Sequence, residues 1–246
     1  KDAQLLRLNY GILSLHLILT ATFTVLPLIL RDNLGMTSAV HWHVYLPVML
    51  LSVAAMVPFI ILAERRRRMK QVFLGAILAV ALAEFGLSLW HASLISVALL
   101  LFLFYAGFNL LEATLPSLVS KMAPPDSKGT AMGFYSTSQF FGAFVGGIAG
   151  GWLQGKFGVG GVLTFCGAVA MLWLLAAASM RSPRYLTTQL LQVGMLDGQR
   201  ARALAQRFTQ VRGVAEAVVI ADEGVAYLKV DKHALDEQAL ADVLSA

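Results

Sequence analysis

Six long apolar stretches, separated by short polar connections, dominate the first three quarters of the chain. Each is about 20 residues or longer, the length that a helix needs to cross a bilayer at about 1.5 Å per residue. Between the fifth and the sixth lies the sequence GKFG, which is typical of a turn. The pattern therefore predicts six transmembrane helices, over residues 8–30, 43–63, 71–90, 94–120, 129–153 and 160–180.

The six stretches divide into two sets of three, residues 8–90 and 94–180. Because three spans reverse the direction of the chain, two consecutive triplets must be inverted relative to each other. We infer this repeat from the number of spans alone, since the two triplets share little sequence.

After residue 184 the pattern changes to short segments with strand and helix periods. Asp197 can cap the first helix, and Asp222-Glu-Gly224 is a turn typical of a hairpin. The order β-α-β-β-α predicts a ferredoxin-like α+β domain that lacks its closing strand, so we expect the tail to be truncated. We therefore expect a membrane part over 1–184 and a domain over 185–246, built from segments 185–193, 198–208, 217–221, 225–230 and 235–244.

Composition agrees with a membrane protein. Hydrophobic residues make up 58% of the chain and charged residues 13%, whereas soluble domains carry about 25% charged residues. Residues 1–184 have a net charge of +7 and residues 185–246 of −2. A basic membrane part indicates orientation and contact with anionic lipid, and the acidic tail argues against a nucleic-acid partner. The single cysteine, Cys166, excludes a disulfide framework.

Lys and Arg residues gather on one side of the predicted spans. Because basic connections stay on the cytoplasmic side, we expect a multi-pass protein of the cell inner (plasma) membrane with both termini in the cytoplasm. No signal segment precedes the first span, and we expect the chain to begin within a longer protein. The basic side has Lys1, Arg7, Arg65 to Arg68, Lys70, Lys121, Lys128, Arg181 and Arg184, and the other side has Arg31 and Lys156.

The fifth stretch, Gly129–Leu153, is uncharged and unusually rich in glycine. Its glycines recur four residues apart, so that side chains are missing from a helix face and a neighbouring backbone can approach closely. Two interpretations stay open: fixed helix packing, or a packing face that slides between two arrangements. The two rows are Gly142, Gly146 and Gly150, and Gly147 and Gly151.

Polar residues within the spans are candidates for a substrate and proton pathway. On the fourth span Tyr105, Asn109 and Glu112 lie at i, i+4 and i+7, and therefore on one helix face. A carboxylate inside a span needs a cavity or a partner, and a buried one can carry a proton. Alternatively, Glu112 lies close enough to the membrane surface to be solvated.

Further polar candidates lie on the first and fifth spans. His16 and Thr20 share a face of the first span. His16 either titrates near neutral pH, as histidine can, or only hydrogen-bonds a neighbouring helix. On the fifth span Tyr135 and Gln139 are one turn apart and precede the glycine rows.

Two segments carry a resemblance to a known family. Pro58–Val72 reads PFIILAERRRRMKQV, an acidic residue followed by basic ones, and Pro124–Gly151 reads PPDSKGTAMGFYSTSQFFGAFVGGIAGG. Both resemble the C-terminal half of a major facilitator superfamily transporter of the drug:proton antiporter type. The resemblance implies half of that all-α membrane fold, and a missing N-terminal half with six further helices.

The resemblance also implies roles for residues. The first, second, fourth and fifth spans would line a central cavity, while the third span, with Glu84, would lie outside it. Glu64, Arg65 and Arg68 match the acidic and basic positions of a cytoplasmic gate loop, which pairs charges across the two halves; alternatively, the arginines only set orientation and contact lipid. Arg67 stands where the family usually has glycine, which puts the expected tight turn in question.

The tail resembles small heavy-metal-associated ferredoxin-like domains. The likeness lies in Gly213–Asp231, GVAEAVVIADEGVAYLKVD, and a transporter half followed by such a tail is similar to proteins whose tail is called the YAM domain. Heavy-metal domains bind through a Cys-x-x-Cys loop, but the loop here, Val193–Gly198, reads VGMLDG. Because soft metals need thiolates or equivalent ligands, Met195 alone predicts no metal site. We expect a regulatory or assembly module.

These observations predict a secondary transporter without a cofactor, which exports a small amphipathic molecule in exchange for protons. No nucleophile, phosphate loop or metal-ligand motif indicates an enzyme or an ATP-driven pump. The alternative is a non-transporting membrane sensor or scaffold that carries the soluble domain. The expected partners are the missing half, the lipid bilayer, a small-molecule substrate and protons.

Overall fold

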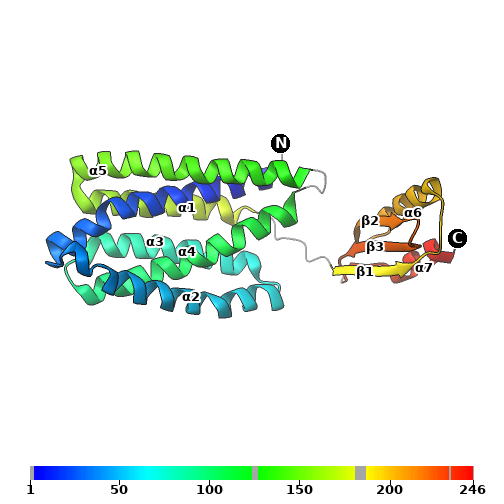
Figure 1. Cartoon of the computed structure of the whole chain (residues 1–246), viewed down its shortest axis with the longest axis horizontal. Coiled ribbons are helices and arrows are strands. Elements are labelled where there is room, and N and C mark those ends of the chain that lie inside the picture. The colour runs from blue at the N-terminus through cyan, green and yellow to red at the C-terminus, as the bar shows by residue number, and fades with distance from the viewer. Residues whose placement is uncertain (1–2, 124–126, 181–186, 233, 246) are drawn as a thin grey trace. The chain divides into compact units, whose positions relative to one another are not determined.

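The chain folds into two units, Lys1–Pro183 and Arg184–Ala246, which are described separately below. The first is a bundle of long helices, and the second combines a small sheet with two helices (Figure 1). The computed structural model describes residues 3–123, 127–180, 187–232 and 234–245.

Within the described residues, the first unit has five helical elements that are long and apolar enough to cross a membrane. Helix α1 continues into a π-helical turn, Ile29–Asn33, and a short 3₁₀ turn, Ser38–Val40, precedes α2. The outer ends of these helices lie within two residues of the predicted bounds, except that α1 begins five residues earlier, at Ala3. Their bounds are Ala3–Leu28 (α1), Trp42–Arg65 (α2), Met69–Leu89 (α3), Leu94–Met122 (α4) and Lys128–Ala178 (α5).

Helix α5 contains both the fifth and the sixth predicted span. Gly158 interrupts its helical geometry with φ 66° and ψ −168°, at the end of the predicted GKFG turn. The helix reverses there: Gly146 packs on the backbone of Leu17, and Cys166 lies against the carbonyl of the next residue, Ile18. Twenty residues of straight helix would separate these contacts by about 30 Å. Figure 1 shows the second half of α5 returning along the bundle.

The bundle is held by apolar packing between all five elements. Helix α1 packs most extensively on α5, while α3 lies against both α4 and α5, and α2 lies mainly against α4. Its interior contains fully buried aromatic side chains, such as Phe73 and Trp173, whose rings meet edge to face. Many large apolar side chains remain exposed, including Leu50 at 63% and Phe140 at 73%. A surface of this kind is expected where lipid or another apolar helix covers the protein.

The second unit has the predicted β-α-β-β-α order. The three strands are antiparallel in the order β1-β3-β2. The Asp197 side chain accepts a hydrogen bond of 2.8 Å from the backbone N–H of Arg200, as expected for a helix cap. Phe208 and Leu228 are fully buried in its core. The fold class is thereby confirmed. The bounds are Thr187–Gln192 (β1), Gly198–Gln210 (α6), Val214–Ile220 (β2), Val225–Val230 (β3) and Glu237–Ser245 (α7).

Candidate substrate and proton site

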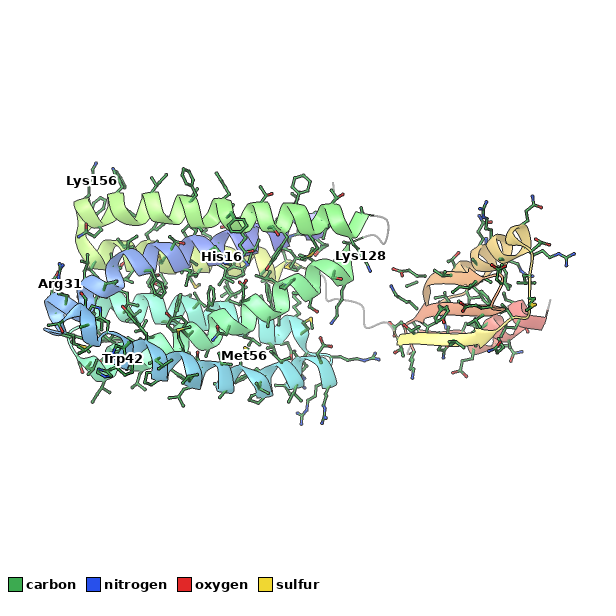
Figure 2. All side chains as sticks on the ribbon, in the orientation of Figure 1. His16, Arg31, Trp42, Met56, Lys128 and Lys156 are labelled. Atoms are coloured by element: carbon green, nitrogen blue, oxygen red, sulfur yellow. The ribbon has the colours of Figure 1, made fainter. Side chains whose placement is uncertain are left out.

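Three polar side chains from three different helices meet inside the bundle. Gln139 of α5 lies between His16 of α1 and Glu112 of α4. Its Nε2 atom is 2.8 Å from His16 Nε2 and donates a hydrogen bond of 3.3 Å to Glu112 Oε1. The second carboxylate oxygen, Glu112 Oε2, is 3.9 Å from His16 Nε2. Figure 2 shows His16 between the two ends of the bundle.

The hydrogen-bond pattern fits a neutral histidine. His16 Nδ1 lies 3.3 Å from the carbonyl oxygen of Ile12, which can only accept, so Nδ1 carries a proton in this contact. Nε2 is then free to accept a hydrogen bond from the Gln139 amide. The amide has two N–H groups, and it can serve His16 and Glu112 together.

The glycine row explains how Gln139 reaches α1. Gly142 follows Gln139 by one turn, and a Cβ atom built on it would overlap the carbonyl oxygen of Leu13. The α5 backbone can therefore lie directly against the α1 backbone only because this side chain is missing. This close approach brings the side-chain amide of Gln139 within hydrogen-bonding distance of His16.

The site is enclosed on one side and open on the other. The His16 side chain is 13% exposed and the Glu112 side chain 38%. The ring of Phe108 lies 6.0 Å from the His16 ring, between centroids, and closes the apolar side. Within the described residues, Glu112 Oε2 accepts no hydrogen bond. The carboxylate thus has one oxygen held by the amide and one buried oxygen without a hydrogen-bond partner among the described residues, which lies within reach of a proton or of a protonated His16.

The remaining polar candidates lie outside this cluster. Asn109 donates a hydrogen bond of 3.0 Å to Ser52 Oγ and so connects α4 to α2. Tyr105 is buried, and its ring meets that of Phe23 edge to face. Thr20 lies beside Gly147, where a built Cβ would be 3.6 Å from the threonine methyl group.

Tyr135 lies one turn before Gln139 on α5. Its side chain is only 5% exposed, and its hydroxyl has no hydrogen-bond partner within the described residues. By its place on α5 it lies near the cluster without being bonded to it. A substrate or water could satisfy this hydroxyl.

The predicted gate loop connects α2 to α3. Glu64 accepts a hydrogen bond of 2.8 Å from Lys121 at the end of α4, rather than pairing with the arginines that follow it in sequence. Arg67 has φ 53°, the one positive φ among the described residues other than glycine. The tight turn therefore forms without the glycine usual in the family. Arg65 and Arg68 are exposed on either side of it.

The two glycine rows have different surroundings. A Cβ at Gly146 would overlap the carbonyl oxygen of Leu17, as one at Gly142 would overlap that of Leu13, and a Cβ at Gly150 would lie 2.9 Å from Ala21 Cα, so this row packs on α1. At Gly147 the nearest atom would be at an ordinary contact distance, and at Gly151 none of the described atoms lies within 4 Å.

A second buried carboxyl group lies away from the His16 cluster. Glu84 of α3 is fully buried, and the Thr22 hydroxyl of α1 lies 2.8 Å from its Oε1. The same hydroxyl is 2.8 Å from the carbonyl of Ile18, but it has a single hydrogen to donate. A protonated Glu84 that donates to Thr22 satisfies both contacts. Glu84 therefore connects α3 to α1 rather than lining a pathway.

The comparison with known families agrees with this architecture. The profile described as "Major Facilitator Superfamily" matches residues 9–216, which is most of the chain. The chain belongs to the major facilitator superfamily. The match includes most of α1 and all of α2, α3, α4 and α5, and it continues into the second unit.

Individual members of the superfamily are similar over much of the chain. It is 41% identical over 232 residues to "Inner membrane transport protein YajR" of Escherichia coli (strain K12), covering 94% of this chain and 50% of that protein. It is 30% identical over 175 residues to an "Uncharacterized transporter" of Buchnera aphidicola subsp. Baizongia pistaciae, covering 70% and 44%. It is 28% identical over 145 residues to "Multidrug resistance protein MdtH" of Proteus mirabilis, covering 59% and 34%. The chain thus spans half or less of the length of these relatives.

The resemblance found in the sequence, a transporter half with a ferredoxin-like tail, is confirmed by the family match and by YajR. Members of the superfamily are multi-pass membrane transporters, and the name of YajR gives the inner membrane as its location. Within the described residues, no group of three or more His, Cys, Asp or Glu side chains could hold a metal ion.

Proposed function

We propose that this chain forms one half of a proton-coupled secondary transporter that exports a small amphipathic molecule. The observation that carries the proposal is the His16–Gln139–Glu112 cluster, in which two titratable groups from different helices share one amide. The names of YajR and of MdtH, a transport protein and a multidrug resistance protein, support export of small molecules. The substrate would bind between this half and six further helices, since transporter sites lie between two such repeats.

Protonation of His16 changes which helices the cluster holds together. In the neutral state Gln139 donates to His16, and this contact joins α5 to α1. Once Nε2 carries a proton, it can no longer accept from the amide N–H, so Gln139 must either leave the ring or turn its carbonyl oxygen toward it and give up its bond to Glu112. His16 then forms an ion pair with Glu112 across the existing 3.9 Å separation, which joins α1 to α4. A proton can drive a conformational change only through such a difference between two states.

Orientation follows from the charges at the two ends of the bundle. Lys128 lies at one end, and Arg31 and Lys156 lie at the other (Figure 2). The end with Lys128 also has the arginines of the gate loop, and we infer that it faces the cytoplasm, because basic loops are retained there. Cysteines introduced at Lys128 and Lys156, in a variant without Cys166, would test this by labelling from each side of the membrane. Labelling of position 128 from outside intact cells would contradict the inference.

The decisive test is the Glu112→Gln variant of the complete transporter, reconstituted into vesicles. Glutamine keeps the shape and the hydrogen-bonding capacity of the side chain but fixes the site in a neutral form. We expect proton-coupled substrate flux, or pH-dependent substrate binding, to be lost while the protein stays folded. Glu84→Gln is the matched control, since it makes the same change outside the cluster, and it should have a milder effect. Unchanged pH dependence in Glu112→Gln would show that the proton site lies elsewhere, with the other half of the transporter the first place to search.

The alternative, a membrane-anchored sensor or scaffold, predicts no flux at all from the complete protein. We expect the present chain alone to be inactive as well, because it contains only one of the two halves between which a substrate would bind. Substrate flux by the complete protein, with all its spans, therefore distinguishes the two functions. Proton-driven flux by vesicles with this chain alone would contradict the half-transporter proposal.

A further inference from the structure

A groove lies on the face of the bundle formed by α2, α3 and α4. We call it the α2–α3–α4 groove, and its volume is about 370 Å³. Its walls include Met56 and Phe59 from α2, Val72 from α3 and Ala106 from α4. Gly75 leaves space in it, because a Cβ atom built there would meet no atom within 4 Å. The groove is therefore partly the result of a missing side chain.

The groove and the His16 cluster lie on opposite faces of α4. The groove-lining positions of α4 are 103, 106, 107 and 110, which recur at helical spacing and form one face. At about 100° per residue, Glu112 points roughly 170° away from the centre of that set. An occupant of the groove would thus not contact the candidate proton site.

The polar lining residues of the groove, Arg68 and Gln71, gather at one end. Arg68 is exposed, and within the described residues its guanidinium group has no hydrogen-bond or ion-pair partner. The carboxylate of the same loop, Glu64, is bonded to Lys121 instead. A positive charge without a neutralising partner therefore stands at the mouth of an apolar groove.

The length of the groove matches one leaflet of a bilayer. Along α3 it extends from Arg68 to Ala79, a rise of about 16 Å at 1.5 Å per residue. Half of a hydrocarbon core about 30 Å thick is about 15 Å. The positive charge of Arg68 would lie at the depth of the lipid headgroups, and the apolar wall of the groove has the length of one acyl chain. These two parts together complement a phospholipid with an anionic headgroup.

We propose that the α2–α3–α4 groove is a binding site for an anionic phospholipid from the leaflet at the basic end of the bundle. The headgroup phosphate pairs with Arg68, and an acyl chain lies along Gly75 between Phe59 and Ala106. A free inorganic anion would leave the apolar wall uncovered, and an apolar helix from another chain would leave the guanidinium of Arg68 without a partner. A phospholipid satisfies both parts of the surface.

Native mass spectrometry of the purified chain in detergent tests the charge. The probes are dioleoylphosphatidylglycerol, which is anionic, and dioleoylphosphatidylcholine, which is zwitterionic. We expect one phosphatidylglycerol to be retained in preference to phosphatidylcholine, and Arg68→Gln to weaken it about fivefold, the usual effect of one basic residue at a lipid surface. Arg66→Gln is the matched control, because it removes the same charge from the same exposed loop but does not line the groove.

A second pair of variants tests the groove itself. Gly75→Leu should fill it without a clash and reduce retention of both lipids, whereas Gly75→Ala should reduce it less. Equal loss from Arg66→Gln and Arg68→Gln would reduce the site to a general basic surface and overturn the proposal. Undiminished lipid binding to Gly75→Leu would also overturn the proposal. So would the absence of a one-to-one lipid adduct with the unmodified chain, and the groove would then be assigned to another helix or to a second copy of this chain.

Discussion

The contact between α1 and α5 gives a prediction whose size follows from the structure. A Cβ added at Gly146 would overlap the carbonyl oxygen of Leu17 and lie 2.8 Å from its Cα. Carbon atoms pack best at about 3.5–4.0 Å, so the two helices would have to separate by about 1 Å. The atoms in the way belong to the backbone, and no side-chain rotation can relieve the overlap.

The matched control is Gly151, five residues along the same helix. A Cβ there would meet no described atom within 4 Å. Replacing glycine by alanine favours the helix by about 0.5–1 kcal/mol at both positions, so this term cancels in the comparison. The difference left between Gly146→Ala and Gly151→Ala is the cost of overpacking, about 1–3 kcal/mol.

Thermal unfolding of the chain in detergent would measure this difference. At about 2–4 °C per kcal/mol for a protein of this size, Gly146→Ala should unfold roughly 2–12 °C below Gly151→Ala. Gly146→Leu should lower the folded yield further, and Gly147→Leu should have a smaller effect because its nearest neighbour is farther away. Equal unfolding temperatures for the two alanine variants would refute the argument that this row sets the distance between α1 and α5.

Three further predictions concern other parts of the chain. The free energy of unfolding of Glu84→Gln should lie within about 1 kcal/mol of that of the unmodified chain, because a neutral amide can replace a protonated carboxyl. Glu84→Lys should lower it by about 3–5 kcal/mol, because the lysine would be an unpaired buried charge. Folded yield and thermal unfolding test both. Gly158→Ala should cost about 1–3 kcal/mol, because φ 66° with ψ −168° is a conformation that other residues avoid; a normal melting temperature would contradict this. The second unit, whose loop offers Met195 and no thiolate, should form no tight one-to-one complex when titrated with Cu(I) or Zn(II).

The helices could be predicted from the sequence because hydrophobicity and length determine them almost alone. The boundary between the fifth and sixth spans was the hardest part, since the helical stretches on its two sides meet directly and only the backbone geometry of Gly158 separates them. The short sequence GKFG signalled the turn. In the second unit β2 begins at Val214, earlier than the predicted 217, and its pairing with β3 is irregular between Val214 and Glu216.

The candidate site was only partly predictable. Helical spacing places Asn109 and Glu112 on one face of α4, but it does not show which helices lie against that face. In the structure Asn109 bonds to Ser52 of α2, while Glu112 bonds to Gln139 of α5. No sequence signal identifies Ser52 as a partner, since the pair is 57 residues apart.

Periodicity in the sequence does not predict which glycine row packs on a neighbouring helix. Both rows have the same four-residue spacing, and only the position of α1 distinguishes Gly146, on its backbone, from Gly151, which faces none of the described atoms. At the gate loop the replacement of glycine by Arg67 left the tight turn in question, and the structure forms the turn with Arg67 at φ 53°. A left-handed conformation costs such a residue about 1–2 kcal/mol, which the surrounding helix ends can supply.

The glycine row and the polar cluster have complementary roles at the same helix pair. Gly142 and Gly146 contact the repeating carbonyl groups of Leu13 and Leu17, and such a face has no interlocking side chains to fix one arrangement. The specific contact on this face is the one between Gln139 and His16, and it depends on whether the histidine carries a proton. This contact joins two neutral groups, and an ordinary hydrogen bond is worth about 0.5–1.5 kcal/mol, which overlaps the lower part of the packing difference worked out above for one glycine. Loss of the contact when His16 gains a proton would therefore shift the balance between two packings of α1 on α5 by about two- to tenfold, and the proposed proton coupling depends on such a difference between two states.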